Sequence, residues 1–150
     1  MTKVLVQLAA GAFGSAGYAF CFHLRRRYIL PAMLGGIIGW GCYLLSSFYF
    51  GGIFLPTLLA GFFTDLYAEI LARVFKAPST PFFITSAIPL FPGSTLYYCM
   101  DAIVRNDLTK AAFYGKTTIL YALGIAAGMA IAWSLCDFHR KLTGLRTRHS

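Results

Sequence analysis

The sequence predicts an all-α integral membrane protein, and three observations lead to this fold class. The first is composition: 58% of the residues are hydrophobic and 12% are charged, whereas a soluble domain carries about 25% charged residues. The second is that the apolar residues form runs of about 20 residues, the length that crosses a bilayer as a helix. The third is that lysines and arginines gather between these runs, as they do in loops beside a membrane.

These runs predict about five transmembrane helices in a single transmembrane helical domain that covers residues 1–150. We expect no separate soluble domain within this length. The expected spans are residues 4–22, 28–47, 53–75, 82–104 and 111–136, and a basic cytoplasmic tail follows at 137–150.

The first span is interpreted as a retained helix rather than a cleaved signal peptide. Arg25, Arg26 and Arg27 follow it directly. A signal peptide carries its positive charge ahead of the apolar core, and arginines behind the core oppose translocation.

Two later spans contain pairs of glycines four residues apart. Gly35 and Gly39 lie in the second span, and Gly124 and Gly128 lie in the last. Such pairs allow another helix to approach closely. A glycine-rich nucleotide loop is disfavoured at 35–41, because that motif follows a strand and apolar residues surround this one.

The third span carries Asp65, Glu69 and Arg73 at intervals of four residues, which places them along one helix face. Charge at membrane depth is costly and usually faces the interior of a bundle. Asp65 and Glu69 are therefore candidate proton-coupling residues. The alternative is that Glu69 and Arg73 lie at the membrane interface and that Asp65 hydrogen-bonds a neighbouring helix.

The fourth span is predicted to be a broken helix. Pro89, Pro92 and Gly93 lie in its middle, and two missing amides with a flexible residue interrupt a helix. Unpaired backbone at membrane depth is tolerated where protein or a water-filled cavity satisfies it. The break therefore indicates either a solute path or a packed kink with no ligand.

The half-helix after Gly93 is expected to present free amides near the middle of the membrane, where they favour a carboxylate or another anion. Asp101 shares one face with Ser94 and Tyr97 and is a third candidate for proton coupling. For Ser94 and Tyr97 the alternatives are capping and simple packing. The candidate substrate-binding residues are Pro89, Pro92, Gly93, Ser94, Thr95 and Tyr97.

The distribution of positive charge predicts an orientation. With five spans, nine lysines and arginines fall on one side and four on the other. The richer side is expected to be cytoplasmic, which places the N-terminus outside and the C-terminus inside. Because these charges lie in loops that face lipid, the net charge of +8 does not indicate nucleic-acid binding.

The remaining polar residues predict no metal, no cofactor and no enzymatic activity. The four cysteines stand alone in the apolar runs, and the three histidines lie at helix ends or in the tail. An enzyme would need a clustered nucleophile and base, or a set of metal ligands. We expect free thiols that pack as small residues.

The segment Ile88-Pro89-Leu90-Phe91-Pro92-Gly93, followed by Ser94, Thr95 and Tyr97, closely resembles the Pro-x-x-Pro-Gly motif of the threonine/serine exporter family. The resemblance is to its short, membrane-only component, which is similar to the small subunit of a two-component succinate exporter. It extends more loosely over most of the chain.

The resemblance implies a multi-pass protein of the bacterial cytoplasmic (inner) membrane. Such a protein exports threonine, serine or a small dicarboxylate, and an ion gradient drives the export. The resemblance further implies a longer membrane subunit of the same family as partner, with homo-oligomers within the complex as a further option. A structural or assembly subunit that transports nothing itself is the alternative function.

Overall fold

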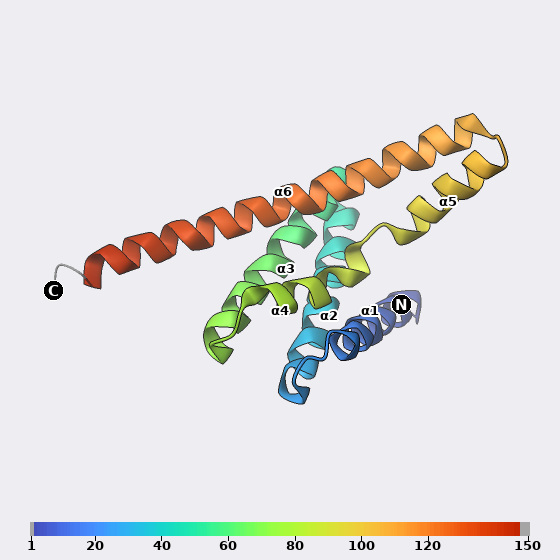
Figure 1. Ribbon diagram of the computed structural model, residues 1–150. Helices are drawn as coiled ribbons and strands as arrows, with labels where there is room; N and C mark the ends of the chain where they lie inside the picture. Colours follow the sequence, from blue (N-terminus) through green and yellow to red (C-terminus); the bar gives the residue numbers. More distant parts are fainter. Residues whose placement is uncertain (1, 148–150) are drawn as a thin grey trace.

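The computed structural model describes the backbone of residues 2–147 and the side chains of residues 2–138. Within this part the chain is all-helical, as predicted, with no strand (Figure 1). The elements are α1 (Thr2–Cys21), α2 (Arg26–Tyr49), α3 (Phe54–Phe75), α4 (Ser79–Ala87), the 3-10 turn η1 (Ile88–Leu90), α5 (Gly93–Val104) and α6 (Leu108–Thr147).

The structure corrects the helix count. The described part holds six α-helices rather than five, because the expected span 82–104 consists of α4 and α5. By length and composition, three helices could cross a membrane: α1, α2 and the segment Leu108–Phe138 of α6. α4 and α5 have 9 and 12 residues, and each is shorter than the roughly 20 that a full crossing needs.

The bounds of the other helices also differ from those expected. α2 begins at Arg26, so Pro31 lies inside the helix, and the Tyr67 hydroxyl donates to the Pro31 carbonyl at 2.9 Å. α6 continues past the expected end at residue 136 and is helical as far as Thr147. The side chains of the basic tail from residue 139 onward lie outside the described residues.

Three helix ends reverse through a residue in the left-handed region. These residues are His23, Lys76 and Asn106, with φ of 52°, 50° and 61°. After α3, for example, the Ala77 amide donates to the Ala72 carbonyl at 3.0 Å, which satisfies a carbonyl that the helix end would otherwise leave unpaired.

α2 lies at the centre of the bundle, where glycines let three other helices approach closely. A Cβ atom added at any of these glycines would overlap a hydroxyl-bearing side chain of a neighbouring helix. The pairs are Gly35 with Ser86 of α4, Gly36 with Ser15 of α1, and Gly39 with Thr64 of α3.

α6 packs on α3 in the same way. A Cβ at Gly124 would overlap Thr57, and one at Gly128 would overlap the Leu58 carbonyl. On the facing helix, Gly61 lies against the backbone of Ile125. Both pairs of glycines noted in the sequence are thus occupied by contacts within this chain.

α5 and the first half of α6 form a two-helix arm that projects from the bundle of α1 to α4 (Figure 1). Among the α5 residues, all of which the structure describes, Ala102 is the buried one. Exposed apolar side chains cover the arm: Leu96, Met100, Ile103, Val104, Phe113 and Ile119.

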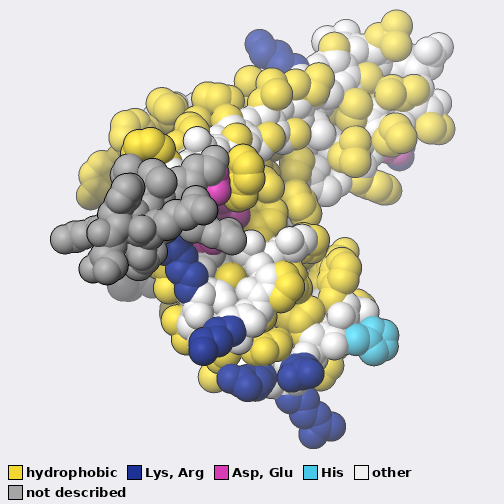
Figure 2. All heavy atoms as spheres, turned by 60° about the vertical axis from the view of Figure 1, so that its left-hand side comes forward, with side chains coloured by type: hydrophobic (Ala, Val, Ile, Leu, Met, Phe, Trp, Pro, Cys, Tyr) yellow, Lys and Arg dark blue, Asp and Glu magenta, His cyan; other side chains and the backbone are white. Residues whose placement is uncertain are grey.

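The basic loops meet at one end of the molecule. The guanidinium carbon of Arg27 lies 5.3 Å from the ring centroid of Phe75, so the α1–α2 turn and the end of α3 are neighbours. Figure 2 shows dark blue side chains gathered at this end. We call this region, with Arg25–Arg27, Arg73 and Lys76, the basic end.

Candidate functional site: a broken helix between two cavities

The helical backbone is interrupted between α4 and α5. α4 ends at Ala87, η1 makes one tight turn, and Phe91 is extended with φ −65° and ψ 133°. Pro89 and Pro92 have no amide with which to continue the hydrogen-bond ladder, and the Gly93 amide donates back to the Phe91 carbonyl at 2.8 Å. A new helix axis then starts at Gly93.

The interruption begins inside the bundle. Thr85, Ser86, Ala87 and Leu90 are all buried, because α4 and η1 pack among α1, α2 and α3. α5 then leaves this bundle and packs on α6. The break therefore stands at the junction between the bundle and the arm.

A cavity of about 160 Å³ lies on the arm side of the break, and we call it the break cavity. Residues of α2, α3, the break, α5 and α6 line it. None of its lining residues is charged: Trp40, Tyr43, Thr57, Pro89, Leu90, Phe91, Pro92, Ser94, Thr95 and Tyr121.

Hydroxyl groups form short networks around the break cavity. The Tyr43 and Tyr121 hydroxyls share a hydrogen bond of 2.9 Å. The Thr118 hydroxyl donates to the Thr95 hydroxyl at 2.9 Å, and Thr95 donates to the Pro92 carbonyl at 3.0 Å. These bonds fix the first turn of α5 against α6.

The first turn of α5 places amides beside this cavity. The Leu96 amide donates to the Pro92 carbonyl at 3.1 Å, which is an ordinary helical bond. The amides of Ser94 and Thr95 precede it, in the positions where a helix has no carbonyl of its own to offer them. They form the positive end of the α5 dipole.

A second cavity of about 260 Å³ lies on the other side of the break, against α1. Gln7, Gly11 and Gly14 line it from α1, and Trp40 and Pro89 line both this cavity and the break cavity. The indole Nε1 of Trp40 is buried with no hydrogen-bond partner among the described residues. Trp40 and Pro89 thus stand between two spaces.

The structure brings four of the six candidate substrate-binding residues to the break cavity: Pro89, Pro92, Ser94 and Thr95. Gly93 is exposed beside it, and a Cβ added there would meet nothing within 4 Å. Tyr97 is 66% exposed and lies against Tyr98, outside the lining of the cavity.

The three candidate proton-coupling residues do not form one group. Asp65 is buried in α3, while Glu69 lines a separate cavity toward the basic end. Asp101 makes an ion pair of 2.9 Å with Arg105 on the arm. That pair belongs to the arm surface and to no cavity that contains Asp65.

Sequence reasoning missed the cavity residues that come from other helices. Trp40, Tyr43, Thr57 and Tyr121 belong to α2, α3 and α6. One local signal was present: Tyr121 is a polar-tipped ring within a helix built largely of Ala, Gly, Leu and Ile. Nothing in the sequence indicated that these side chains meet at the break.

The cysteines and acidic residues form no metal site in the described part of the chain. No group of three His, Cys, Asp or Glu residues is close enough to hold a metal ion among the residues that the structure describes. All four cysteines are free thiols.

An all-helical chain with several apolar helices long enough to cross a bilayer is a multi-pass membrane protein. A family model described as "Threonine/Serine exporter, ThrE" matches residues 7–135. The chain therefore belongs to this family of transport proteins. No curated protein and no solved structure matches it.

Proposed function

We propose that the chain is the membrane subunit of an exporter of small carboxylate-bearing solutes, and that the break cavity binds the solute. One observation supports the proposal: at the break, the first turn of α5 and a set of hydroxyl groups line one cavity. Transporters commonly place substrates where discontinuous helices end near the middle of the membrane.

The chemistry of the break cavity suits an amino acid with a hydroxyl side chain. The amides of Ser94 and Thr95 offer hydrogen bonds and a positive dipole to a carboxylate. The hydroxyls of Tyr43, Thr95 and Tyr121 can bond the ammonium and hydroxyl groups of threonine or serine.

The absence of charge in the lining favours threonine and serine over succinate. The ten lining residues include no lysine or arginine. One carboxylate of succinate can bind the α5 amides, but its second carboxylate has no cation to bind. An amino acid, whose two charges cancel, suits such a site better than a dianion does.

The orientation and the partner belong to the same proposal. With the basic end in the cytoplasm, the N-terminus and the α5–α6 turn face outside a bacterial inner membrane. The exposed apolar side chains of the arm would be covered by lipid and by a longer subunit of the same family.

A structural subunit that binds no solute is the second candidate. The exposed arm favours it, because such a surface suits assembly. The glycine pairs do not favour a structural subunit, because α3 and α4 of this same chain already pack against them.

Export of labelled threonine, serine and succinate tests the proposal, in cells that contain the chain and its longer partner. Thr95→Val removes the hydroxyl that bonds Pro92 and Thr118, and we expect export to fall at least tenfold. The matched control is Thr117→Val, because that hydroxyl only bonds the carbonyl of its own helix at Phe113.

Equal export by the Thr95→Val and Thr117→Val variants, at equal amounts in the membrane, would show that this cavity does not bind the solute. Faster export of succinate than of threonine by the unmodified protein would contradict the preference that the uncharged lining predicts.

A further inference from the structure

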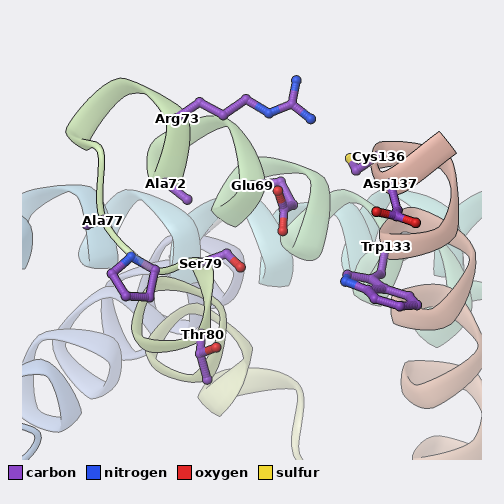
Figure 3. Close-up of a pocket in the computed structure, with 10 residues that line it drawn as sticks. Glu69, Ala72, Arg73, Ala77, Ser79, Thr80, Trp133, Cys136 and Asp137 are labelled. Carbon is purple, nitrogen blue, oxygen red and sulfur yellow. The ribbon is translucent and has the colours of Figure 1, made fainter. Parts of the chain in front are cut away.

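A third cavity, of about 380 Å³, opens at the basic end between α3, the start of α4 and α6. Figure 3 shows side chains of α3 and α6 projecting toward it from opposite sides. Its polar lining comprises Glu69, Arg73, Ser79, Thr80 and Asp137. We call this cavity the vestibule, and it plays no part in the solute site proposed above.

Asp65 lies on α3 one turn before Glu69, the α3 lining residue nearest to it in the chain. Glu69 and Ala72, which line the vestibule, follow Asp65 by four and seven residues, and residues at this spacing share one helix face. Asp65 therefore lies on the helix face that lines the cavity, one turn deeper in the bundle.

The Asp65 carboxyl is buried without a full set of partners. The residue is 8% exposed, and its Oδ2 atom has no hydrogen-bond partner among the described residues. A buried carboxylate without a partner is costly while it is ionised, whereas the neutral acid is much less so. Such a group holds or releases a proton according to its surroundings.

The titratable and polar groups around the vestibule come from three helices. The helix of Asp65 contributes Glu69, and Arg73 lies eight residues from Asp65, or about 12 Å along the axis. α6 contributes Cys136 and Asp137, and α4 contributes the Ser79 and Thr80 hydroxyls. No described cation lines the vestibule apart from Arg73 at its outer part.

α4 joins the vestibule to the break. Its first residues, Ser79 and Thr80, line the vestibule, and its last, Ala87, precedes η1. Phe82, Phe83 and Ala87 of α4 pack with Ala68, which is three residues beyond Asp65 on α3. Asp65 therefore lies next to the packing that positions the break, and α4, with 9 residues, spans the roughly 13 Å between the vestibule and η1.

We propose that Asp65 is the proton-binding site of this exporter and that the vestibule is the path by which the proton leaves it. The direction rests on the proposed function, which places the basic end in the cytoplasm. In the release step the O–H bond of the neutral carboxyl breaks, the proton passes to water in the vestibule, and Asp65 becomes a carboxylate. Binding of a proton from the other side of the membrane reverses this charge change.

Transport by the complex in lipid vesicles separates proton coupling from solute binding. Asp65→Asn keeps the shape of the side chain but cannot exchange a proton. We expect it to reduce accumulation of threonine driven by a pH gradient at least tenfold, and to leave exchange of labelled for unlabelled threonine within twofold of wild type. Asp107→Asn is the control, because asparagine retains the capping bond that Asp107 accepts from the Lys110 amide.

Gradient-driven accumulation that survives Asp65→Asn would overturn the proposal. Loss of exchange together with accumulation would also overturn it, because the residue would then act in solute binding or folding. Accumulation that depends on a sodium gradient and not on pH would also overturn the proposal, because the coupling ion would then be a metal cation rather than a proton. If the unmodified complex exchanges no threonine, the proposed function fails instead.

A second measurement does not depend on transport. Infrared difference spectra of the full chain in lipid vesicles, recorded between acidic and neutral pH, report the protonation of its carboxyl groups. The chain has five acidic side chains, so each can be replaced singly by its amide. We expect one carboxyl band to vanish in Asp65→Asn and to persist in Asp107→Asn. Identical wild-type and Asp65→Asn spectra would show that Asp65 exchanges no proton.

Discussion

At the scale of single residues, the fold depends on glycines that face other helices without a side chain. They differ in what a new methyl group would meet. At Gly39 the nearest atom is the Thr64 hydroxyl oxygen at 2.7 Å, which can rotate away, and the next atoms lie at 3.5 Å or more. At Gly128 it is the Leu58 carbonyl oxygen, with the Phe62 amide nitrogen at 2.8 Å, and backbone atoms cannot move without shifting a whole helix.

This contrast predicts that Gly128→Ala destabilises the chain although alanine favours helices. Overpacking costs about 1–3 kcal/mol, which exceeds the propensity gain of up to about 1 kcal/mol. Gly14→Ala is the matched control, because a Cβ at Gly14 would meet nothing within 4 Å; we expect it to be neutral or slightly stabilising. Unfolding in mixed detergent micelles measures both. Equal effects of the two substitutions would contradict the close packing of α6 on α3.

At the scale of elements, the break between α4 and α5 organises the site. Two prolines remove the amides that would join the helices. The polar groups exposed there are not left in lipid, because residues of α2, α3 and α6 line the space beside them. The break thus forms part of the wall of the break cavity.

The double substitution Pro89→Ala with Pro92→Ala tests this role. It restores two amides and favours helix through the break by about 3 kcal/mol for each residue that becomes part of a helix interior. We expect export to fall at least tenfold while the protein still folds and reaches the membrane in wild-type amounts. Pro31→Ala is the control, because it also restores an amide within a helix and keeps the carbonyl that accepts the Tyr67 hydroxyl. Normal export by the double variant would show that the interruption is not needed.

The sequence predicted the elements better than the site. Composition and the length of the apolar runs predicted the all-helical class, and the two prolines predicted the break. The partners of the break came from residues distant in sequence: Trp40 and Tyr121 reach it because glycine contacts bring α2 and α6 close to it. Tyr97 was expected at the site from local spacing, but α5 leaves the bundle at Gly93 and Tyr97 is exposed. The spacing of residues within α5 does not predict the direction that the helix axis takes after the break.

At the scale of the whole molecule, charge and shape give the protein two different ends. The turn after α1 and the end of α3 meet through Arg27 and Phe75, and the vestibule opens there. The arm carries its α5–α6 turn away from this end (Figure 1). In the turn, hydrogen bonds from the Lys110 side chain and backbone hold the pKa of Asp107 below its usual value.

This polarity predicts the accessibility of two loops. With the native cysteines replaced, His23→Cys marks the basic end and Asn106→Cys marks the tip of the arm; both native residues are exposed. A membrane-impermeant thiol reagent added to intact cells should label position 106 and not position 23, because the proposed orientation places the basic end in the cytoplasm. Inside-out vesicles should give the reverse. Labelling of position 23 from outside would show that the orientation is the reverse of the one proposed.

The most direct test of the central claim is protection of a thiol placed at the break. Ser94→Cys, in a chain without other cysteines, puts a thiol in the lining of the break cavity, and Tyr97→Cys puts one three residues further along α5, outside that lining. We predict that threonine slows alkylation at position 94 in proportion to its occupancy and leaves position 97 unaffected. Equal alkylation rates at position 94 with and without saturating threonine, in a complex that still exports it, would contradict a solute site at the break.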